Sequence, residues 1–144
     1  MAKKKIFVSF DYEKDKMYKY LLEAWDANPH FDFSFNDQSP DEIQSNLISV
    51  VKANLTRKIN DSTYTLVLCG KEVNKLHKDH VQIGYCNWQN YEIAKSILNG
   101  NKIILVKLYD DFQVPVEARC CHPIIVEEFS KEAIIEGLEK AQNR

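Results

Sequence analysis

The sequence alternates short apolar runs with segments of helical periodicity, and this alternation limits the fold more than any other feature. Three runs are too rich in β-branched and aromatic residues, and too short, to be helices: Lys5–Phe10 (KIFVSF), Thr63–Gly70 (TYTLVLCG) and Lys102–Leu108 (KIILVKL). Strands that alternate with helices are typical of a parallel sheet covered on both faces. A length of 144 residues, 44% of them apolar, is enough for one core. We therefore predict a single α/β domain over residues 1–144.

Two weaker patterns add strands to this sheet. Phe31–Phe35 (FDFSF) alternates aromatic and polar residues, which predicts a strand with one wetter face near an edge of the sheet. After a long connection, Tyr109–Pro123, the short apolar run Ile124–Val126 predicts a last strand. Right-handed crossovers between five parallel strands give a three-layer flavodoxin-like sandwich with helices on both faces, and we expect the strand order 2-1-3-4-5.

Four helices are predicted between and after these strands. The first spans Asp15–Asn28 and ends before Pro29, and the second begins at the cap Ser39–Glu42. The third begins near Trp88 and is closed by Asn99-Gly100, and the last is capped by Ser130. The residues expected on their buried faces are, helix by helix, Met17, Tyr20, Leu21, Ala24 and Trp25; Ile43, Leu47, Val50, Val51 and Leu55; Ile93, Ala94 and Ile97; and Ala133, Ile134, Gly137, Leu138 and Ala141.

The charge and hydropathy of the chain exclude several classes of partner. A net charge of -2 and a pI of about 6.1 give no electrostatic case for binding nucleic acid or an anionic membrane. No segment approaches the ~20 apolar residues of a membrane span, and the start MAKKKIFVSF lacks the apolar core and cleavage site of a signal peptide. We therefore expect a cytoplasmic protein.

The cysteines and histidines give little support for a metal site. Four cysteines without a Cys-x-x-Cys pair are expected to be free thiols in the cytoplasm. His77 and His80 are three residues apart, with Cys86 downstream, so a metal site is one interpretation. The other, polar residues on an exposed loop, is favoured because the spacing is unfamiliar and no fourth ligand is evident. We expect no bound metal.

A ligand-binding crevice can be placed from the fold class alone. In a doubly wound parallel sheet, ligands bind at the carboxyl ends of the strands where the strand order reverses. That rule places the crevice at the ends of the first and third strands. The residues expected to line this end of the sheet are Phe10, Asp11, Tyr12, Asn36, Asp37, Cys69 and Gly70.

Motifs that commonly accompany this architecture are missing. The chain has neither Gly-x-Gly-x-x-Gly nor Gly-x-x-x-x-Gly-Lys-Ser/Thr, so the phosphate cradles of Rossmann and P-loop proteins are absent from the sequence. FDYEKD follows the first strand, where a flavodoxin needs small and hydroxyl residues. A phosphoacceptor receiver needs an aspartate at the end of the third strand, where Cys69-Gly70 stands. No Gly-x-Ser-x-Gly elbow is present.

One pair of residues in the third helix raises a functional question. Trp88, Glu92 and Ser96 are four residues apart and form one stripe, which the apolar periodicity turns away from the core. The stripe has two interpretations. Glu92 is an ordinary surface glutamate beside a half-buried tryptophan, which is the more common arrangement, or it is a carboxylate beside an aromatic wall on the crevice side of the sheet.

Four segments of the chain together match a known family: KIFVSFDYEKD, NDQSPDEIQSNLISVVKANL, TYTLVLCG and NWQNYEIAKSILNGNKIILVKL. The most specific element is Trp-x-x-x-Glu followed by an apolar residue, which is met by Trp88 and Glu92-Ile93. In these segments the chain resembles a TIR domain, and more narrowly the bacterial TIR-like family that includes the ThsB proteins of Thoeris antiphage defence. The resemblance covers about residues 4–140.

This resemblance implies an activity and roles for named residues. In enzymatically active members the glutamate cleaves NAD at the nicotinamide-ribose bond, so the catalytic role falls on Glu92, with NAD as substrate and no further cofactor. Phe10 and Asp11 are implied as contacts to the ribose or base, with Trp88 as an apolar wall. Tyr12, Asp37 and Cys69 are weaker choices, placed by the crevice argument. The product, ADP-ribose or a cyclised nucleotide, would activate a separate effector protein in antiphage defence.

Two further functions stay open from the sequence. The first is a TIR interaction module without catalysis, which would act by self-association through the Asn36–Glu42 loop and exposed helix faces. The second is a receiver-like regulator phosphorylated on an aspartate. It ranks lowest because the third strand does not end in one.

Overall fold

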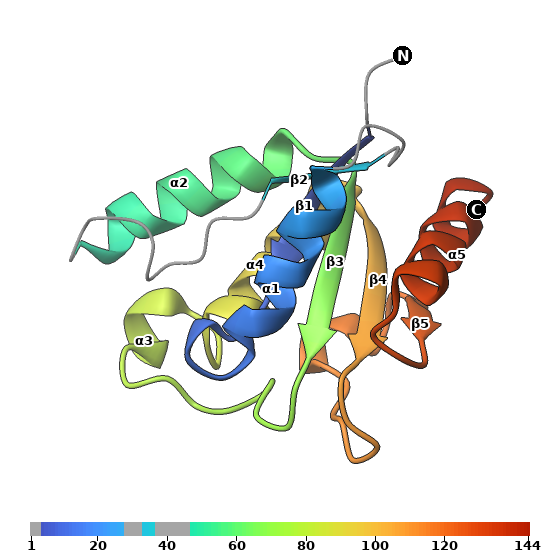
Figure 1. Ribbon diagram of the computed structural model, residues 1–144. Coiled ribbons are helices and arrows are strands. Elements are labelled where there is room, and N and C mark those ends of the chain that lie inside the picture. The colour runs from blue at the N-terminus through green and yellow to red at the C-terminus, as the bar shows by residue number, and fades with distance from the viewer. Residues whose placement is uncertain (1–3, 28–32, 37–46) are drawn as a thin grey trace.

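A central parallel sheet with helices on both faces makes up the protein, as the α/β prediction required (Figure 1). The computed structural model describes residues 4–27, 33–36 and 47–144. Neighbouring strands are parallel, and the order across the sheet is β2-β1-β3-β4-β5. The strands are β1 (Lys4–Ser9), β2 (Phe33–Asn36), β3 (Tyr64–Cys69), β4 (Lys102–Lys107) and β5 (Ile124–Val126).

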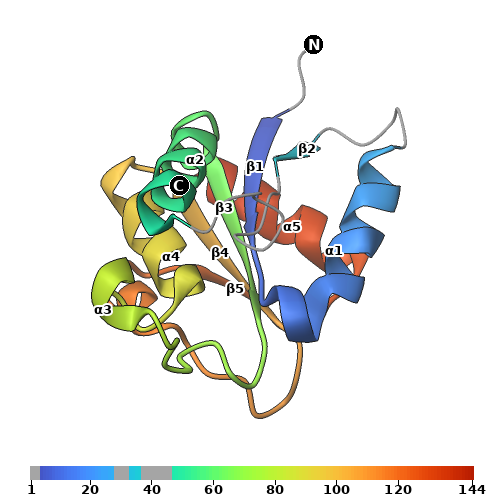
Figure 2. The ribbon, with the colours of Figure 1, turned by 90° about the vertical axis from the view of Figure 1, so that its left-hand side faces the viewer.

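The helices divide between the two faces of the sheet, which Figure 2 shows nearly edge-on. α1 and α5 cover one face, and α2 and α4 cover the other. Their bounds are α1 (Tyr12–Asp26), α2 (Ile48–Asn60), the short α3 (His80–Ile83), α4 (Trp88–Leu98), the 3-10 turn η2 (Val116–Ala118) and α5 (Lys131–Gln142). Among the described helices, none has the length and apolar character needed to cross a membrane.

The alternation of side chains along β1 decides which residues can meet at the end of the sheet. Ile6, Val8 and Phe10 pack into the core beneath α1 and α5. Phe7 packs with α2 and α4 on the opposite face. Because successive side chains of a strand point to opposite faces, Ser9 lies on the α4 side and Phe10 on the α1 side.

Local signals at the helix ends agree with the sequence in three places. The Asn87 side chain accepts a hydrogen bond from the Asn90 backbone N–H at the start of α4, and Ser130 caps α5 through the Ala133 N–H. Gly100, with φ of +79°, follows the end of α4 in a left-handed conformation that glycine adopts without strain. The predicted stop at Asn28-Pro29, the cap at Ser39–Glu42 and the buried position of Ile43 lie outside the described residues.

The buried faces of the first two helices were predicted less well. On α1 the side chains of Met17, Tyr20 and Leu21 are 74%, 49% and 48% exposed, so their assignment to the core was wrong. The helix turns its Asp15, Lys19 and Leu22 face inward instead. On α2, Val51 and Leu55 are buried as predicted, whereas Leu47 and Val50 are exposed. Both segments carry more apolar residues than one helix face can bury, so periodicity alone did not identify the inner stripe.

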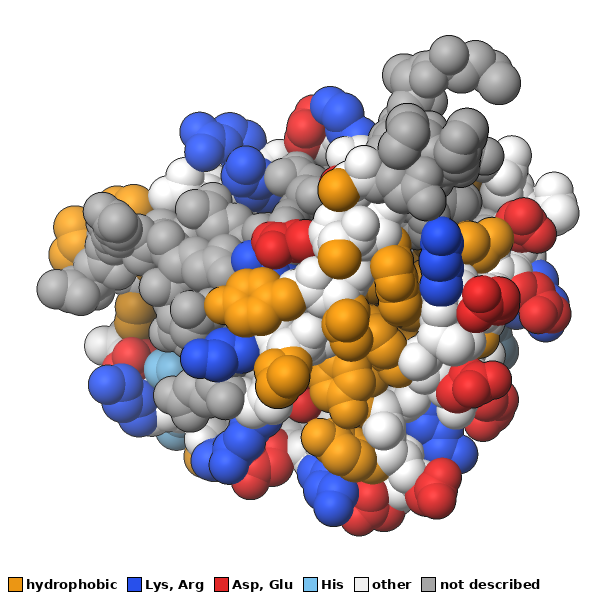
Figure 3. Space-filling view, in the orientation of Figure 1, with side chains coloured by type: hydrophobic (Ala, Val, Ile, Leu, Met, Phe, Trp, Pro, Cys, Tyr) orange, Lys and Arg blue, Asp and Glu red, His pale blue; other side chains and the backbone are white. Residues whose placement is uncertain are grey.

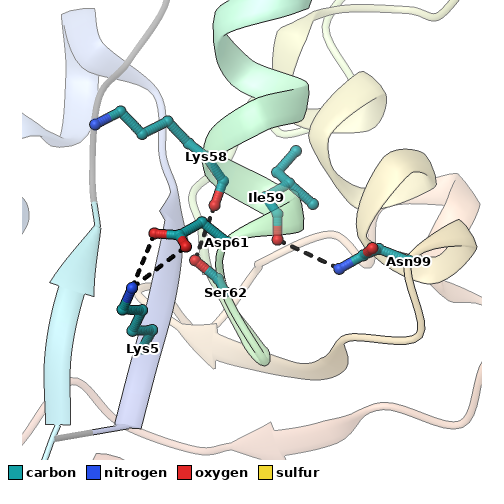
Figure 4. Close-up of polar contacts among 6 residues, drawn as sticks. All are labelled: Lys5, Lys58, Ile59, Asp61, Ser62 and Asn99. Atoms are coloured by element: carbon teal, nitrogen blue, oxygen red, sulfur yellow. Dashed lines mark hydrogen bonds and ion pairs between the residues drawn. The ribbon is translucent and has the colours of Figure 1, made fainter. Parts of the chain in front are cut away.

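Polar contacts fix the carboxyl end of α2 against its neighbours (Figure 4). The Lys5 ammonium lies 3.3 and 3.1 Å from the two carboxylate oxygens of Asp61, and Asn99 donates to the Ile59 carbonyl across to α4. Ser62 Oγ donates to the Lys58 carbonyl and closes the last turn. The Lys5–Asp61 pair is more than half exposed and contributes little free energy. The bonds to backbone carbonyls hold α2 and α4 in register at the end of the sheet opposite the predicted crevice.

Candidate functional site

The inner face of α4 is polar where it crosses the sheet. Gln89, Glu92 and Ser96 are all buried there, and Glu92 is only 2% exposed. The sequence predicted that the stripe of Trp88, Glu92 and Ser96 turns away from the core, and for Glu92 and Ser96 this prediction was wrong. Of the residues predicted to point inward, Ile93 is fully buried, but Ile97 is 36% exposed.

The sheet beneath α4 explains this reversal, because it presents polar partners. Ser9 Oγ at the end of β1 donates a 2.7 Å hydrogen bond to Glu92 Oε1. Thr65 Oγ1 donates a 2.7 Å bond to Ser96 Oγ, and Gln89 Nε2 donates to the Leu68 carbonyl at 3.1 Å. Buried polar groups are tolerated when they are hydrogen-bonded, so these pairs allow α4 to pack with its polar face inward.

Glu92 is a buried acid with a strongly shifted pKa. Burial raises the pKa of its carboxyl from the ordinary 4.5 to about 8, and the Ser9 hydrogen bond lowers it by a smaller amount. Across the described part of the chain, no cationic side chain forms an ion pair with Glu92. Near neutral pH the group is therefore mainly protonated and uncharged. Strongly perturbed acids of this kind concentrate at functional sites.

Replacing Ser9 with alanine is expected to raise the pKa of Glu92 further, because the hydroxyl that stabilises its carboxylate is removed. A carboxyl carbon NMR titration of Glu92 in wild type and the Ser9→Ala variant measures this change. Ser96→Ala is the matched control, since it removes a buried bond of equal length between α4 and the sheet. An unchanged Glu92 pKa in Ser9→Ala, or equal shifts in both variants, would contradict the assignment.

Trp88 lies at the start of α4 and is half-buried. Its ring meets Tyr91 edge-to-face with centroids 5.6 Å apart. Both rings pack against the cluster that joins Phe7 to residues of α2 and α3, including Ile83. Trp88 therefore packs with Tyr91 on the α2 side of α4. Its predicted role as a wall of the substrate site stays a prediction, since it is not among the residues that line the cavity.

The other predicted site residues do not gather at one point. Asp11 lies just beyond β1 and is partly exposed. Phe10 is 4% exposed and packs in the core under α1 and α5, on the opposite face of the sheet from Glu92. Cys69 is fully buried with Ile93, and burial raises the pKa of its thiol to about 12. Tyr12 begins α1, but its side chain and all of Asp37 lie outside the described residues.

A cavity of about 210 Å³ opens at the carboxyl ends of β1, β3 and β4. Asp11 and Gln89 line it, and Gln89 precedes Glu92 by one helical turn. The remaining lining residues are Lys14, Asp15, Lys71, Glu72, Val73 and Tyr109. Sequence reasoning located this end of the sheet but missed Asp15, although its spacing of four residues from Asp11 at the start of a helix was a usable signal.

The histidines form local contacts in the loop before α4. His77 Nδ1 accepts a hydrogen bond from the Asp79 N–H at 2.9 Å, and His80 Nδ1 lies 3.0 Å from the His77 carbonyl oxygen. Within the described ranges, no group of three or more His, Cys, Asp or Glu side chains is placed to hold a metal ion. All four cysteines are unpaired thiols.

Comparisons with known proteins bear on this geometry. The family model described as "Thoeris protein ThsB, TIR-like domain" matches residues 7–112, a span that includes Ser9, Asp15, Trp88 and Glu92. Among solved structures, the Clostridium botulinum CMP N-glycosidase BcmB is similar at 15% sequence identity and a TM-score of 0.51, over 94% of this chain and 99% of that one. At that identity the similarity shows a shared fold. No curated protein sequence matches the chain.

Proposed function

Because the chain belongs to the TIR-like domain family of the Thoeris protein ThsB, we propose that it is an NAD-consuming enzyme that cleaves the nicotinamide-ribose bond. One observation carries the proposal: Glu92, the glutamate of Trp-x-x-x-Glu, is a buried acid hydrogen-bonded to Ser9 at the carboxyl end of β1. Gln89 lies one turn before this acid on α4 and lines the cavity. The carboxyl ends of parallel strands are the usual ligand site in this class of sheet.

A single carboxylate suffices for this chemistry. Cleavage of a glycosidic bond passes through an oxocarbenium-like state, which a nearby anion stabilises. Nicotinamide leaves from a cationic pyridinium, so its departure needs no proton from a second acid. Water then attacks the sugar to give ADP-ribose, or another nucleophile of the substrate attacks to give a cyclised nucleotide.

The biological role proposed with this activity is antiphage defence in the cytoplasm. The nucleotide product would act as a signal that activates a separate effector protein. NAD is the substrate in this scheme, and the reaction uses no further cofactor or metal. Self-association of the TIR-like domains is proposed as the route to the active form.

Hydrolysis of a pyrimidine nucleotide is a second candidate, favoured by the proton that Glu92 holds near neutral pH. A neutral base such as cytosine is a poor leaving group unless it is protonated, and a protonated carboxyl can act as its general acid. The name of the structurally similar BcmB states that it is a CMP N-glycosidase. The two substrates make opposite demands on Glu92, because NAD cleavage uses the anion and CMP cleavage uses the acid.

An interaction module without catalysis is the third candidate, and the outer face of α1 favours it. Met17, Tyr20 and Leu21 expose large apolar side chains there. Figure 3 shows hydrophobic side chains gathered in the middle of the face that carries α1. A scaffold of this kind should tolerate the nearly isosteric Glu92→Gln change, whereas an enzyme should not.

The pH dependence of cleavage separates the two enzymatic candidates. The protein is incubated with NAD or CMP between pH 6 and 9, alone and in lysates of phage-infected cells, and products are identified by mass. We expect nicotinamide release whose rate rises as the pH approaches and passes about 8, since Glu92 then ionises. If cytosine is released from CMP instead, at a rate that falls over the same pH range, the substrate is CMP rather than NAD. Equal nucleotide pools in infected cells carrying wild type or Glu92→Gln would refute catalysis.

A further inference from the structure

We propose that the cavity beside Gly70 holds the ribose of a nucleotide, and that Asp15 accepts hydrogen bonds from the vicinal hydroxyls of that sugar. The inference rests on the proposed function in taking a nucleotide as the ligand. It deepens that function by naming the part of the substrate that is recognised and the residue that recognises it. Asp15 has no role in the sequence-based predictions.

The position of Asp15 carries the inference. The residue is 3% exposed, yet it lines the cavity of about 210 Å³ between α1, α4 and the ends of β3 and β4. Among the described residues, no hydrogen bond is found to its carboxyl. The carboxyl oxygens are not among the enclosed polar atoms that lack a partner, so they are open to the cavity and available to a ligand that brings donors of its own.

The Asp15 carboxyl lies against Gly70 at the end of β3. A Cβ atom at position 70 would stand 2.6 Å from Asp15 Oδ2, so a side chain there would displace the carboxyl from this position. Burial is the main cause that raises the pKa of Asp15 to about 6, followed by repulsion from Asp11 and Glu72, while Lys14 lowers it. A hydroxyl donor from a ligand would relieve this unfavourable state.

The other groups lining the cavity suit the rest of a nucleotide. Lys14 and Lys71 line the cavity and can pair with a phosphate attached to the sugar. The Lys71 ammonium lies over the Tyr109 ring, 5.1 Å from its centroid, so a phosphate that pairs with Lys71 would lie beside this ring. Carboxylates that accept from ribose hydroxyls are common in nucleotide-binding sheets. The cavity is smaller than the ~300–1,000 Å³ of pockets that enclose drug-sized ligands, so it suits one sugar and its phosphate.

A metal ion is the competing occupant for a carboxylate cluster. Within the part of the chain that the structure describes, no group of three or more acidic, histidine or cysteine side chains is placed to bind one. The two lysines in the lining add positive charge, which further disfavours a free cation. A sugar diol needs no group of metal ligands, and because it is uncharged the two lysines do not repel it.

Binding of paired ribose and deoxyribose nucleotides tests the inference. The ligands are CMP against dCMP and AMP against 2′-deoxy-AMP, titrated by calorimetry into the Glu92→Gln protein so that none is cleaved. With Asp15 intact, we expect each ribonucleotide to bind about tenfold or more tightly than its deoxy partner, the effect of one hydrogen bond to a charged group. In Glu92→Gln/Asp15→Ala, which removes both acceptor oxygens, the preference should fall to about one.

Glu72→Gln in the same background is the matched control. It removes a negative charge from the lining of the same cavity, but from an exposed residue paired with Lys75. It should change the affinity of both members of each pair together and keep the ribose preference. Circular dichroism confirms that each variant is folded. Equal binding of ribo and deoxy forms with Asp15 intact, or a preference that survives Asp15→Ala, would overturn the inference, as would the absence of nucleotide binding.

The outcome is separable from that of the proposed function. Nucleotide cleavage by wild type, together with a ribose preference unchanged by Asp15→Ala, would refute the role of Asp15 and leave the enzyme activity standing. The expected binding pattern without cleavage of any nucleotide, in infected cells as well as in purified protein, would support the ribose site and refute the activity.

Discussion

Glu92→Gln is expected to lower the rate of nicotinamide release about 10³-fold while the protein stays folded. Loss of one preorganised group that stabilises transition-state charge commonly has an effect of 10²–10³, and Glu92 is proposed as the sole anion at the reacting carbon. The amide oxygen of glutamine can still accept the hydrogen bond from Ser9 Oγ, so the local packing is preserved. Nicotinamide release measured by chromatography, with mass identification of the nucleotide product, gives the ratio of rates.

Ser96→Ala provides the control for this loss. Ser96 lies one turn after Glu92 on the same buried face, and its bond to Thr65 has the same length as the bond between Ser9 and Glu92. If α4 only had to be held on the sheet, the two variants would lose similar activity. A rate in Glu92→Gln within a fewfold of wild type would remove Glu92 from the chemistry.

The second large effect concerns stability and pH. In the unfolded chain the pKa of Glu92 is near 4.5, and in the folded protein it is about 8. Below pH 4.5 both states hold the proton, and this residue adds no pH dependence. Between pH 4.5 and 8 the unfolded chain releases the proton while the folded protein keeps it, so the free energy of unfolding falls as the pH rises. At about 1.4 kcal/mol per pKa unit, the loss reaches at most about 5 kcal/mol.

The Glu92→Gln variant lacks this titrating group, so its stability relative to wild type should rise across the same range and level off above pH 8. Denaturant unfolding of both proteins at pH 5, 6.5, 8 and 9 measures the difference. The raised pKa of Asp15 acts in the same direction near pH 4 to 6, but it is present in both proteins and cancels. A difference that does not change with pH would mean that Glu92 ionises normally in the folded state.

The layer structure of the fold could be predicted because the signals for buried parallel strands are local. Tyr64–Cys69 is buried along its whole length, and its apolar, β-branched composition is visible in the sequence. Helix ends were also predictable where a side chain caps its own helix, as Ser130 does for α5. These features depend on residues near each other in the chain.

The inner faces of the helices depend on partners far away in the sequence, and there the prediction failed. Glu92 and Ser96 looked like surface residues because polar side chains are normally solvated. Their burial is explained by Ser9 and Thr65, which lie 83 and 31 residues away. A pattern within one helix does not contain this information.

Asp15 was missed for a related reason. Its burial depends on a glycine 55 positions later, since Gly70 leaves the space that the carboxyl occupies. The sequence showed Gly70 as a residue that excludes a phosphoacceptor site, not as the neighbour of an acid. Only the joining of β1 to β3 in the sheet brings the two residues together.

The proton on Glu92 has a consequence for how ligands are discriminated. Burial raises the pKa of Glu92 to about 8, so ionising this acid at neutral pH is unfavourable. The pyridinium ring of NAD carries a full positive charge and favours the ionised form of Glu92 when it lies nearby. A nucleotide with a neutral base does not. The protein would then distinguish NAD from a nucleotide with a neutral base by the charge of the ring, before the shape of any base is recognised.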